Sequence, residues 1–500
     1  MAQVVDTNSR RRLPILLRAS YGVGHVLNDV CASMWFTYLL VWFHLVLQFD
    51  SALSGIVLLI GQVADAISTP FVGIESDRRD NFWLCRYGRR KTWHLFGTIC
   101  VIGSFPFIFM PCISCQDSHH WAQLIYYAAF VVIFQFGWAS VQISHLSLIP
   151  DLTPDEHERT ELTAIRYSFT VVSNVLVYLV TWGVLHVTNE NEDDQIGPKD
   201  VGKFQHIALI GIAIGVITSI VFHAGVKEER EEEDDEGLQL QRRGSIMTAS
   251  KFLQEGQFYQ VALLYMATRL YVNLVQVYVP LYLHKSLLMP AENLAIIPLV
   301  MFLSSFVFSF VIKYLNKHWG RKISFILGCL VGIAPCIWVW FGEGERYNTY
   351  EIYPVAILFG AGSSIMLVTS LGVTADYIAH NTESGAFVYG AMSFADKLSN
   401  GLAVAIIQDF KCLITCPHYY RDVLTFVCGG SAAFGLLVLL TLVPFEIGRR
   451  RRGEVLRAPY LVIENDHCSL EDSNQVAPSS ENVTETDEGN GAENVSVQAS

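Results

Sequence analysis

The chain has 500 residues, of which 52% are hydrophobic, 12% aromatic and only 16% charged, and its mean hydropathy is +0.35. This composition is too apolar for a soluble protein of this length and predicts an all-α protein that crosses the membrane many times. The formal net charge of −13 comes mainly from residues 228–236 and from the tail after Glu464, so it describes solvated segments and indicates no nucleic-acid partner.

Twelve stretches of about 20 apolar residues follow one another along the chain, each long enough to cross a bilayer as a helix. In the first half they cover residues 20–47, 52–74, 92–110, 121–149, 162–187 and 206–225. In the second half they cover residues 258–283, 294–311, 323–341, 352–378, 386–410 and 423–443. The first span is too long for a cleaved signal sequence and lacks a small-residue cleavage site, so we expect it to remain in the protein.

The basic residues indicate the orientation of these spans. If both termini lie in the cytosol, most of the 34 Lys and Arg residues share that side, including the clusters at 10–12, 86–91, 317–322 and 449–452. Basic flanks resist translocation, so this asymmetry predicts cytosolic termini.

A polar, charged stretch between the sixth and seventh spans divides the chain into two halves. The halves echo each other, because "YGRRK" at 87–91 follows the second span and "WGRK" at 319–322 follows the eighth. This repeat predicts two related six-helix bundles. The predicted parts are a cytosolic N-terminus at 1–19, an N-terminal bundle at 20–225, an acidic cytosolic linker at 226–252, a C-terminal bundle at 253–445 and a disordered cytosolic tail at 446–500.

Six ionisable residues lie inside the predicted spans: Asp29, Asp65, Arg166, Arg269, Asp396 and Lys397. A central Asp costs about 2.5–3.5 kcal/mol on membrane-insertion scales, so these charges need a purpose. One interpretation is that three acids and three bases form ion pairs that hold the bundles together. The other is that they line a water-filled cavity that binds a charged solute or a coupling ion. Four further polar residues can line the same cavity, and the two histidines among them are candidate proton carriers: His25, Asn28, Gln142 and His145.

The cysteines are scattered, and most read as small buried hydrophobic residues. Two pairs stand out on the predicted non-cytosolic side, Cys112 with Cys115 and Cys412 with Cys416. They could form structural disulfides in an oxidising lumen. No histidine completes a zinc set at the usual spacing, so we expect no metal site.

The loop after the second span carries a glycine, acidic and basic string: Gly73, Asp77, Arg78, Gly88, Arg89 and Arg90. Its plain interpretation is a basic anchor that follows the orientation rule. The string also resembles the loop between helices two and three of the major facilitator superfamily. That resemblance implies a latch that holds the two halves together on the cytosolic face.

Longer strings sharpen the resemblance. "DAIST" at 65–69, "SLIP" at 147–150 and "SFADKLSNGLA" at 393–403 resemble the glycoside–pentoside–hexuronide cation symporter branch of that superfamily. "GHVLNDVCASMWFTYLL" at 24–40, "FGWASVQISHLSLIP" at 136–150 and "SGAFVYGAMSF" at 384–394 are similar to a vertebrate branch that imports cysteine into lysosomes and melanosomes. The resemblance implies cysteine as the solute, a lysosomal and melanosomal address, and a role in pigmentation.

The resemblance also assigns site positions. The sodium-binding positions of the bacterial sugar symporters correspond to Asp65, Thr69, Gln142 and Lys397 here, and two of their three carboxylates are replaced. A proton on Asp65, or no coupling ion, therefore fits better than sodium. The sugar-contacting positions correspond to Asp29 and Arg166, which can equally clamp the ammonium and carboxylate groups of an amino acid.

The leading hypothesis is a secondary transporter for cysteine whose substrate-binding residues are Asp29, Asp65, Arg166, Arg269 and Lys397. One alternative is a proton-coupled carrier of a sugar or another organic solute, and another is a membrane scaffold or receptor that transports nothing. The sequence has no Walker-type phosphate loop and no catalytic constellation, so we expect neither an enzyme nor a cofactor.

The polar segments carry two short motifs. Tyr460 and Ile463 bound the string "YLVI", which has the form that clathrin adaptors read and predicts a sorting signal. "RRGS" places Ser245 in the linker as a candidate phosphorylation site. The sequons at Asn482 and Asn494 fall in the predicted cytosolic tail, so we expect neither to be glycosylated.

Overall fold

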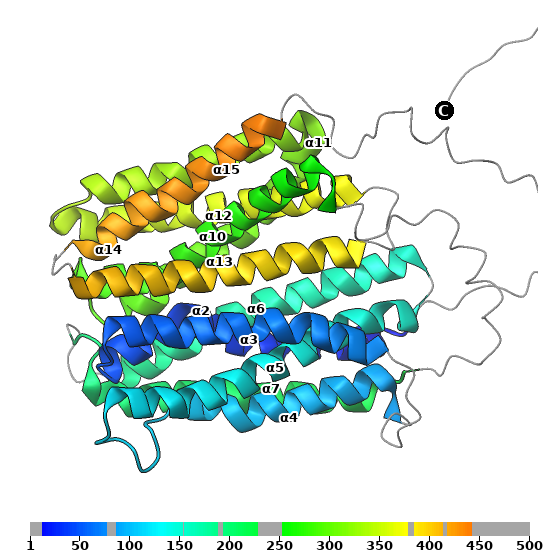
Figure 1. Cartoon of the computed structure of the whole chain (residues 1–500), viewed down its shortest axis with the longest axis horizontal. Coiled ribbons are helices and arrows are strands. Elements are labelled where there is room, and N and C mark those ends of the chain that lie inside the picture. Colours follow the sequence, from blue (N-terminus) through cyan, green and yellow to red (C-terminus); the bar gives the residue numbers. More distant parts are fainter. Residues whose placement is uncertain are drawn as a thin grey trace, which may run out of the picture. The chain divides into compact units, whose positions relative to one another are not determined.

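The computed structural model describes residues 13–77, 87–153, 155–188, 194–228, 253–378, 385–413 and 418–442. These residues form long helices that lie side by side with roughly parallel axes (Figure 1). The all-α prediction is confirmed.

The first half contains six helical crossings. The first consists of α1 (Ile15–Val23), α2 (Val26–Val41) and the π-helical turn η1 (Trp42–Val46). The others are α3 (Ser51–Asp77), α4 (Arg89–Ile108), α5 (His120–Leu152), α6 (Glu156–Thr188) and α7 (Val201–Gly225), with the short 3-10 helix η3 (Pro198–Asp200) before α7.

The second half also contains six. They are α10 (Gly256–Lys285), two crossings within α11 (Asn293–Phe341), η6 with α12 (Tyr347–Glu351 and Ile352–Ile378), α13 (Gly385–Leu413), and α14, η8 and α15 together (Tyr419–Asp422, Val423–Cys428 and Gly429–Leu442). The 49 residues of α11 are divided by Gly320, whose φ of 78° is a turn conformation that glycine adopts without strain.

Nine stretches of the described chain are long and apolar enough to cross a membrane. The remaining crossings, α4, α10 and α13, are long enough at 20, 30 and 29 residues but more polar. In α13 the adjacent residues Asp396 and Lys397 account for part of this polarity. With α11 counted twice, the described residues give the predicted twelve crossings.

Some helices extend beyond the predicted apolar runs. The first crossing begins at Ile15 rather than residue 20, and α6 begins at Glu156 rather than residue 162. The extra turn of α6 is polar, and that of the first crossing carries Arg18, which forms ion pairs with Glu158 and Glu161. The extra turn of α6 lies outside the apolar run, so hydropathy alone does not find it.

Each half packs mainly within itself, and the halves meet chiefly along the helix pairs α3–α13, α6–α11 and α2–α10. In Figure 1 α13 runs beside α3. The exact bounds of the two bundles, the linker and the tail stay predictions.

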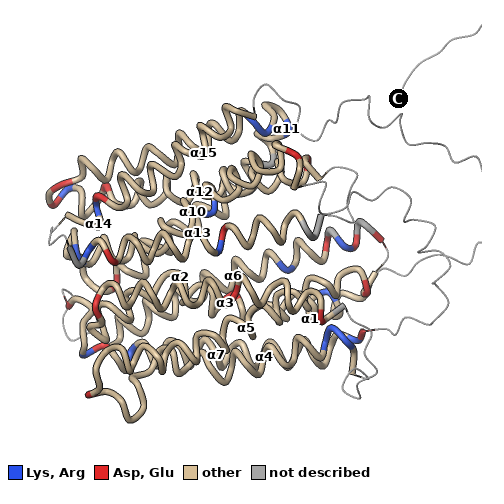
Figure 2. The backbone as a smooth tube through the Cα atoms, viewed as in Figure 1, with Lys and Arg blue, Asp and Glu red and all other residues tan. Residues whose placement is uncertain are grey.

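Charged residues gather near the ends of the helices, and few lie along their middles (Figure 2).

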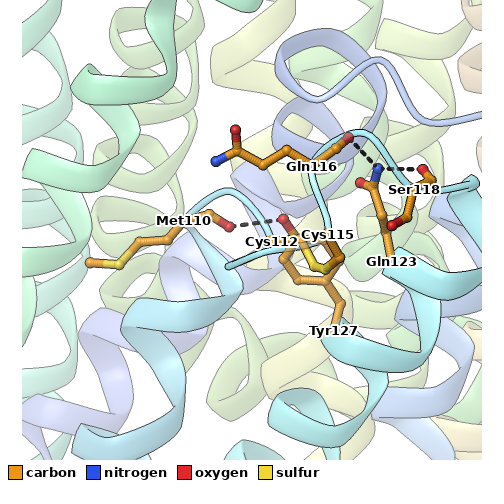
Figure 3. The surroundings of a disulfide bond; sticks show 7 residues. All are labelled: Met110, Cys112, Cys115, Gln116, Ser118, Gln123 and Tyr127. Carbon is orange, nitrogen blue, oxygen red and sulfur yellow. Dashed lines mark hydrogen bonds between the residues drawn. A yellow bond between two sulfur atoms is a disulfide. The ribbon is translucent and has the colours of Figure 1, made fainter.

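The loop after α4 is closed by a disulfide between Cys112 and Cys115, one of the two predicted pairs (Figure 3). Next to it the Tyr127 hydroxyl donates to the Met110 carbonyl at 2.8 Å. Residue Cys416 of the other pair lies outside the described residues.

Candidate functional site

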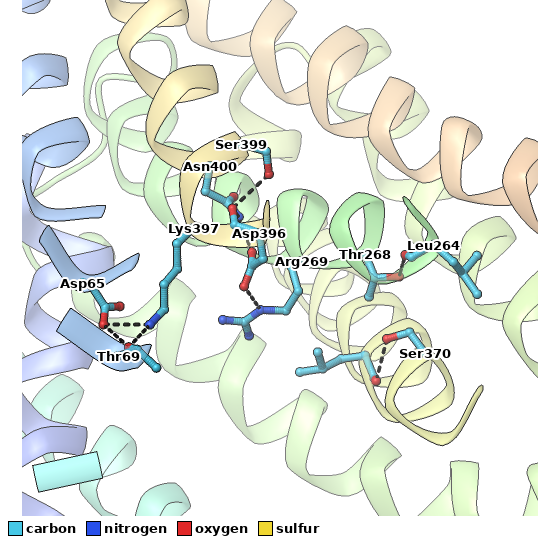
Figure 4. Close-up of polar contacts among 11 residues, drawn as sticks. Asp65, Thr69, Leu264, Thr268, Arg269, Ser370, Asp396, Lys397, Ser399 and Asn400 are labelled. Atoms are coloured by element: carbon cyan, nitrogen blue, oxygen red, sulfur yellow. Dashed lines mark hydrogen bonds and ion pairs between the residues drawn. The ribbon is translucent and has the colours of Figure 1, made fainter. Parts of the chain in front are cut away.

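The central acid of α3 faces a lysine of the other half. Asp65 lies midway along α3, and its Oδ1 is 2.7 Å from Nζ of Lys397 on α13. Thr69, one helical turn after Asp65, accepts a hydrogen bond from Lys397 at 2.8 Å and donates one to Asp65 at 3.0 Å (Figure 4). The Asp65 side chain is only 2% exposed and the Lys397 side chain 12%. This closed triangle joins the two halves of the protein.

The neighbouring acid of α13 has a partner in its own half. Asp396 Oδ2 is 2.9 Å from Nε of Arg269 on α10, and Asn400 donates to its Oδ1 at 2.5 Å (Figure 4). Successive helical residues point about 100° apart, so Asp396 and Lys397 face different neighbours. Asp396 therefore does not neutralise Lys397 but stabilises Arg269 inside the second half.

The third acid, Asp29 on α2, lies within the first half. Its Oδ1 is 3.0 Å from Nδ1 of His25, and its Oδ2 accepts a hydrogen bond from Thr170 of α6 at 3.0 Å. One turn before Thr170, Arg166 interacts electrostatically with Asp29. The Nε atom of Arg166 is buried without a hydrogen-bond partner among the described residues.

The predicted lining residues are divided between different surroundings. Asn28 donates to the Trp138 carbonyl at 2.8 Å, and the Trp138 ring lies 5.7 Å from Nζ of Lys397. No hydrogen bond among the described residues joins the side chain of Gln142 to Asp65. His145 donates to the Tyr21 carbonyl at 2.8 Å and stacks on the Tyr21 ring.

The contacts of the candidate latch that the structure describes stay within the first half. Arg90 pairs with Asp151 of α5 at 2.9 Å, and Glu228, which follows α7, accepts hydrogen bonds from the backbone amides of Arg90 and Lys91 at 3.2 and 3.0 Å. Gly88, with φ of 119°, leaves room for Glu228, because a Cβ there would come within 2.5 Å of Oε2. Gly73 lies on α3, where an added Cβ would meet no described atom of another element within 4 Å, and Arg89 begins α4.

Several predicted residues cannot be placed. The side chain of Asp77 and the whole of Arg78, Ser245, Tyr460 and Ile463 lie outside the described residues. The latch, the phosphorylation site and the sorting signal therefore stay predictions.

Two histidines that the sequence analysis passed over lie close to the site. His94 of α4 and His223 of α7 approach each other to 3.1 Å, and His94 also contacts the Gly24 carbonyl at 3.1 Å. Both fall in predicted spans, so the rule that flagged His25 and His145, a titratable residue inside an apolar run, could have found them.

Mid-helix acids and bases on both halves, with one ion pair between the halves, form an arrangement suited to binding a polar solute within the bilayer and to changing when the halves move. The described residues contain no group of three or more His, Cys, Asp or Glu placed to hold a metal ion.

Comparison with known proteins agrees with this arrangement. Residues 20–409 match the family model described as MFS/sugar transport protein. The chain is 46% identical to major facilitator superfamily domain-containing protein 12 of Homo sapiens over 89% of this chain and 96% of that protein. Its fold resembles the nucleoside transporter NupG, with a TM-score of 0.63 and 12% identity over 86% of this chain and 100% of NupG. It also resembles the D-xylose-proton symporter, with a TM-score of 0.61 and 13% identity over 87% of this chain and 97% of that one.

The family match covers most of the chain, the identity to the human relative extends over nearly its full length, and the structural neighbours share the fold. The chain therefore belongs to the MFS/sugar transport protein family of the major facilitator superfamily and is a multi-pass membrane protein that acts as a secondary transporter, not as an enzyme.

Proposed function

We propose that this transporter carries cysteine from the cytosol into lysosomes and melanosomes by alternating access, in a proton-linked manner, and thereby contributes to pigmentation. The observation that carries the proposal is the electrostatic interaction of Asp29 with Arg166, whose Nε is buried without a hydrogen-bond partner among the described residues. A carboxylate and a planar guanidinium that act on the same site match the ammonium and carboxylate groups of an amino acid. The choice of cysteine rests on the sequence strings that resemble the cysteine-importing branch.

The Asp65–Lys397 pair is proposed as the part of the site that senses which way the transporter faces. It joins α3 to α13, so separation of the halves must break it. Removing one partner of a buried pair strands the other charge at a cost of several kcal/mol, which makes an unassisted separation unfavourable. When the halves separate, a negative charge of the substrate would compensate Lys397. A proton on Asp65 would neutralise that carboxylate.

The decisive experiment is uptake of labelled cysteine by intact organelles with and without the protein. We expect Asp65→Asn to lower uptake at least tenfold per correctly located molecule, because the amide keeps the shape of the side chain but not its charge. Glu343→Gln, which alters an exposed carboxylate that pairs with Arg421, is the matched control and should transport normally. Near-normal uptake by Asp65→Asn would show that this acid is structural.

The double variant Asp65→Asn with Lys397→Gln separates stability from transport. It leaves no unpaired charge, so it should recover the expression level that either single change lowers, while uptake stays low. Restored uptake would contradict the assigned role of the pair.

A proton-coupled carrier of a sugar or another organic solute is the second candidate, favoured by the description of the matching family model. Competition separates the two, because a sugar that blocks cysteine uptake at equal concentration would favour this candidate. A scaffold or receptor that transports nothing predicts that Asp65→Lys with Lys397→Asp leaves all activity intact.

The proposed setting has both termini in the cytosol, where the tail would present Tyr460 and Ile463 to a clathrin adaptor. Tyr460→Ala should then shift protein to the cell surface. Unchanged residence in lysosomes would contradict the sorting signal without touching the transport proposal.

A further inference from the structure

Four histidines form a continuous group inside the first half. His25 lies between α1 and α2, His94 on α4, His145 on α5 and His223 on α7. The ring centroids are 4.9 Å apart for His94 and His223, 5.9 Å for His94 and His145, and 5.6 Å for His25 and His145. His25, His94 and His145 are almost fully buried. Four helical crossings thus contribute imidazoles to one apolar interior.

Hydrogen bonds fix the neutral forms of three of these rings. The Gly24 and Tyr21 carbonyls can only accept, so His94 and His145 each donate from Nε2. Nδ1 of neutral His94 is then an acceptor, and His223 donates to it from Nε2 at 3.1 Å. Nδ1 of His223 accepts in turn from the hydroxyl of Tyr87 at 3.0 Å. Burial raises the pKa of the Tyr87 phenol, which keeps that hydroxyl protonated.

This row of hydrogen-bonded side chains begins at Tyr87 near the surface and leads toward Asp29. Tyr87 precedes α4 and is 42% exposed, whereas His145 is fully buried. At the inner end, Nδ1 of His145 and Nε2 of His25 are buried without hydrogen-bond partners among the described residues. His25 also places Nδ1 3.0 Å from a carboxylate oxygen of Asp29. A buried imidazole nitrogen without a partner is costly unless it receives a proton or a ligand in some state of the protein.

Burial opposes a positive charge on all four rings, and the neighbouring charges decide which ring can best hold one. Asp29 of α2 attracts a positive charge to His25, whereas Arg166 of α6 opposes one on His25 and His145. Lys91 of α4 opposes one on His94 and His223, and it is itself held by the His223 and Val226 carbonyls at 3.2 and 2.6 Å. Tyr21 of α1 adds its uncharged phenol, and Glu228 after α7 lies against the start of α4. Asp29 is thus the acid beside the group.

We propose that His25, His94, His145 and His223 form a proton-binding site that takes up one proton from the Tyr87 end and holds it on His25 beside Asp29. This inference deepens the proposed function, on which its transport arm rests, by placing the coupling proton in the first half rather than on Asp65. Asp65 already has Lys397 and Thr69 as partners, whereas the inner imidazoles have vacant acceptor positions.

Each transfer conserves protons. Tyr87 gives its hydroxyl proton to Nδ1 of His223 and takes one up from a hydronium ion in the adjoining solution. His223 passes its Nε2 proton to Nδ1 of His94 and so keeps its own proton on Nδ1, until its ring turns back. His94, now an imidazolium, passes a proton to Nδ1 of His145 after a ring reorientation, because their centroids are 5.9 Å apart. His145 then passes a proton to His25, where Asp29 stabilises the charge. That charge draws Asp29 away from Arg166 and leaves the guanidinium for a substrate carboxylate.

Proton binding can be measured without any substrate. The full chain, labelled with ¹⁵N-histidine and reconstituted in lipid vesicles, is titrated between pH 4.5 and 8 by solid-state NMR, and His→Gln variants identify each signal by its loss. We expect at least one of the four imidazoles to become charged within this range. Replacing His94 or His223 with Gln should shift the midpoint of that signal by about one pH unit, since interacting sites titrate as a group.

His318→Gln is the matched control. His318 on α11 also hydrogen-bonds a backbone carbonyl, that of Tyr314, but it is exposed and lies outside the group. This variant should leave the midpoint unchanged. Four signals that stay neutral throughout the range in the unaltered protein would overturn the proposal, as would midpoints that do not respond to each other's removal. The titration of the unaltered protein decides the first point even if a variant fails to fold.

The transport arm separates this inference from the proposed function. In vesicles, His223→Gln should lose at least tenfold in cysteine uptake driven by a pH gradient but keep cysteine exchange at equal pH, because exchange needs no net proton movement. Absence of exchange in the unaltered protein would refute cysteine as the solute and leave the titration result standing. Unchanged gradient-driven uptake in His223→Gln would overturn the assigned proton path.

Discussion

The two halves share their outer packing and differ at their centres. In the first half α4 and α5 cross at Gly97 and Gly137, where a Cβ on Gly97 would lie 2.7 Å from the Gly137 carbonyl oxygen. In the second half α11 and α12 cross at Gly332 and Gly362, where a Cβ on Gly362 would lie 2.6 Å from the Gly332 Cα. Small residues that let two helices touch along their backbones are a common device in membranes.

The centres are used differently. In the second half the central arginine, Arg269, is bound by Asp396 at 2.9 Å. In the first half the central arginine, Arg166, keeps a buried Nε without a partner, and its acid, Asp29, is surrounded by imidazole and hydroxyl groups. Two halves of the same architecture therefore differ: the central arginine of the second half has its ion-pair partner, whereas that of the first half can still bind a ligand. For this reason we place the solute and the proton in the first half.

The largest expected effect comes from breaking the satisfied centre. Arg269→Gln leaves Asp396 as a buried charge without its cation, so we expect a loss of about 3–5 kcal/mol in the free energy of unfolding. Thermal unfolding of the purified protein measures it. The double variant Arg269→Gln with Asp396→Asn should recover most of the stability. If Arg269→Gln folds normally but transports nothing, the second centre belongs to the solute site and the contrast between the halves is wrong.

Changing the available centre should affect transport rather than folding. Arg166→Lys keeps the charge but replaces the planar fork with a point charge, so we expect cysteine affinity to fall by at least tenfold at nearly unchanged thermal stability. The measurement is the concentration dependence of uptake. Arg269→Lys is the comparison, because it should lower stability more than affinity. Equal effects of both changes on affinity would remove the proposed division of roles.

The sequence predicted the fold well because hydropathy and charge are properties of each segment alone. Twelve apolar runs and a repeated basic loop were sufficient for the helix count and the two halves. The site was predicted less completely. Asp65 and Lys397 were placed together only through resemblance, and the sequence could not say which acid meets which base. Pairing depends on helix rotation and on which helices are neighbours, as the different partners of Asp396 and Lys397 demonstrate.

The histidine group illustrates a second limit. Its members come from four crossings far apart in the chain, and each alone resembles an ordinary buried histidine. Only the packing of α1, α4, α5 and α7 brings them together. A local sequence pattern cannot carry that information.

The shared glycine crossings should respond alike. Gly97→Ala and Gly362→Ala each push a methyl group against backbone atoms of the facing helix, so we expect each to cost about 1–3 kcal/mol. Gly103→Ala is the matched control on α4, because nothing lies within 4 Å of its added Cβ. In thermal unfolding, Gly103→Ala should therefore be more stable than Gly97→Ala and Gly362→Ala. If only one of the two changes lowers the stability, the close helix contact does not stabilise both halves alike.

The smallest expected effect on stability concerns two ion pairs, one at the corresponding place in each half. Arg90 at the start of α4 meets Asp151 near the end of α5, and Arg321 meets Asp376 near the end of α12. The side chains of the first pair are 14% and 20% exposed, and those of the second 35% and 41%. Solvent screens the second pair more, so Asp376→Asn should cost less than about 1 kcal/mol, and Asp151→Asn should cost more. Thermal unfolding in low and high salt tests this, because the loss for Asp376→Asn should shrink more with salt. Identical losses and identical salt responses would show that burial does not distinguish these two pairs.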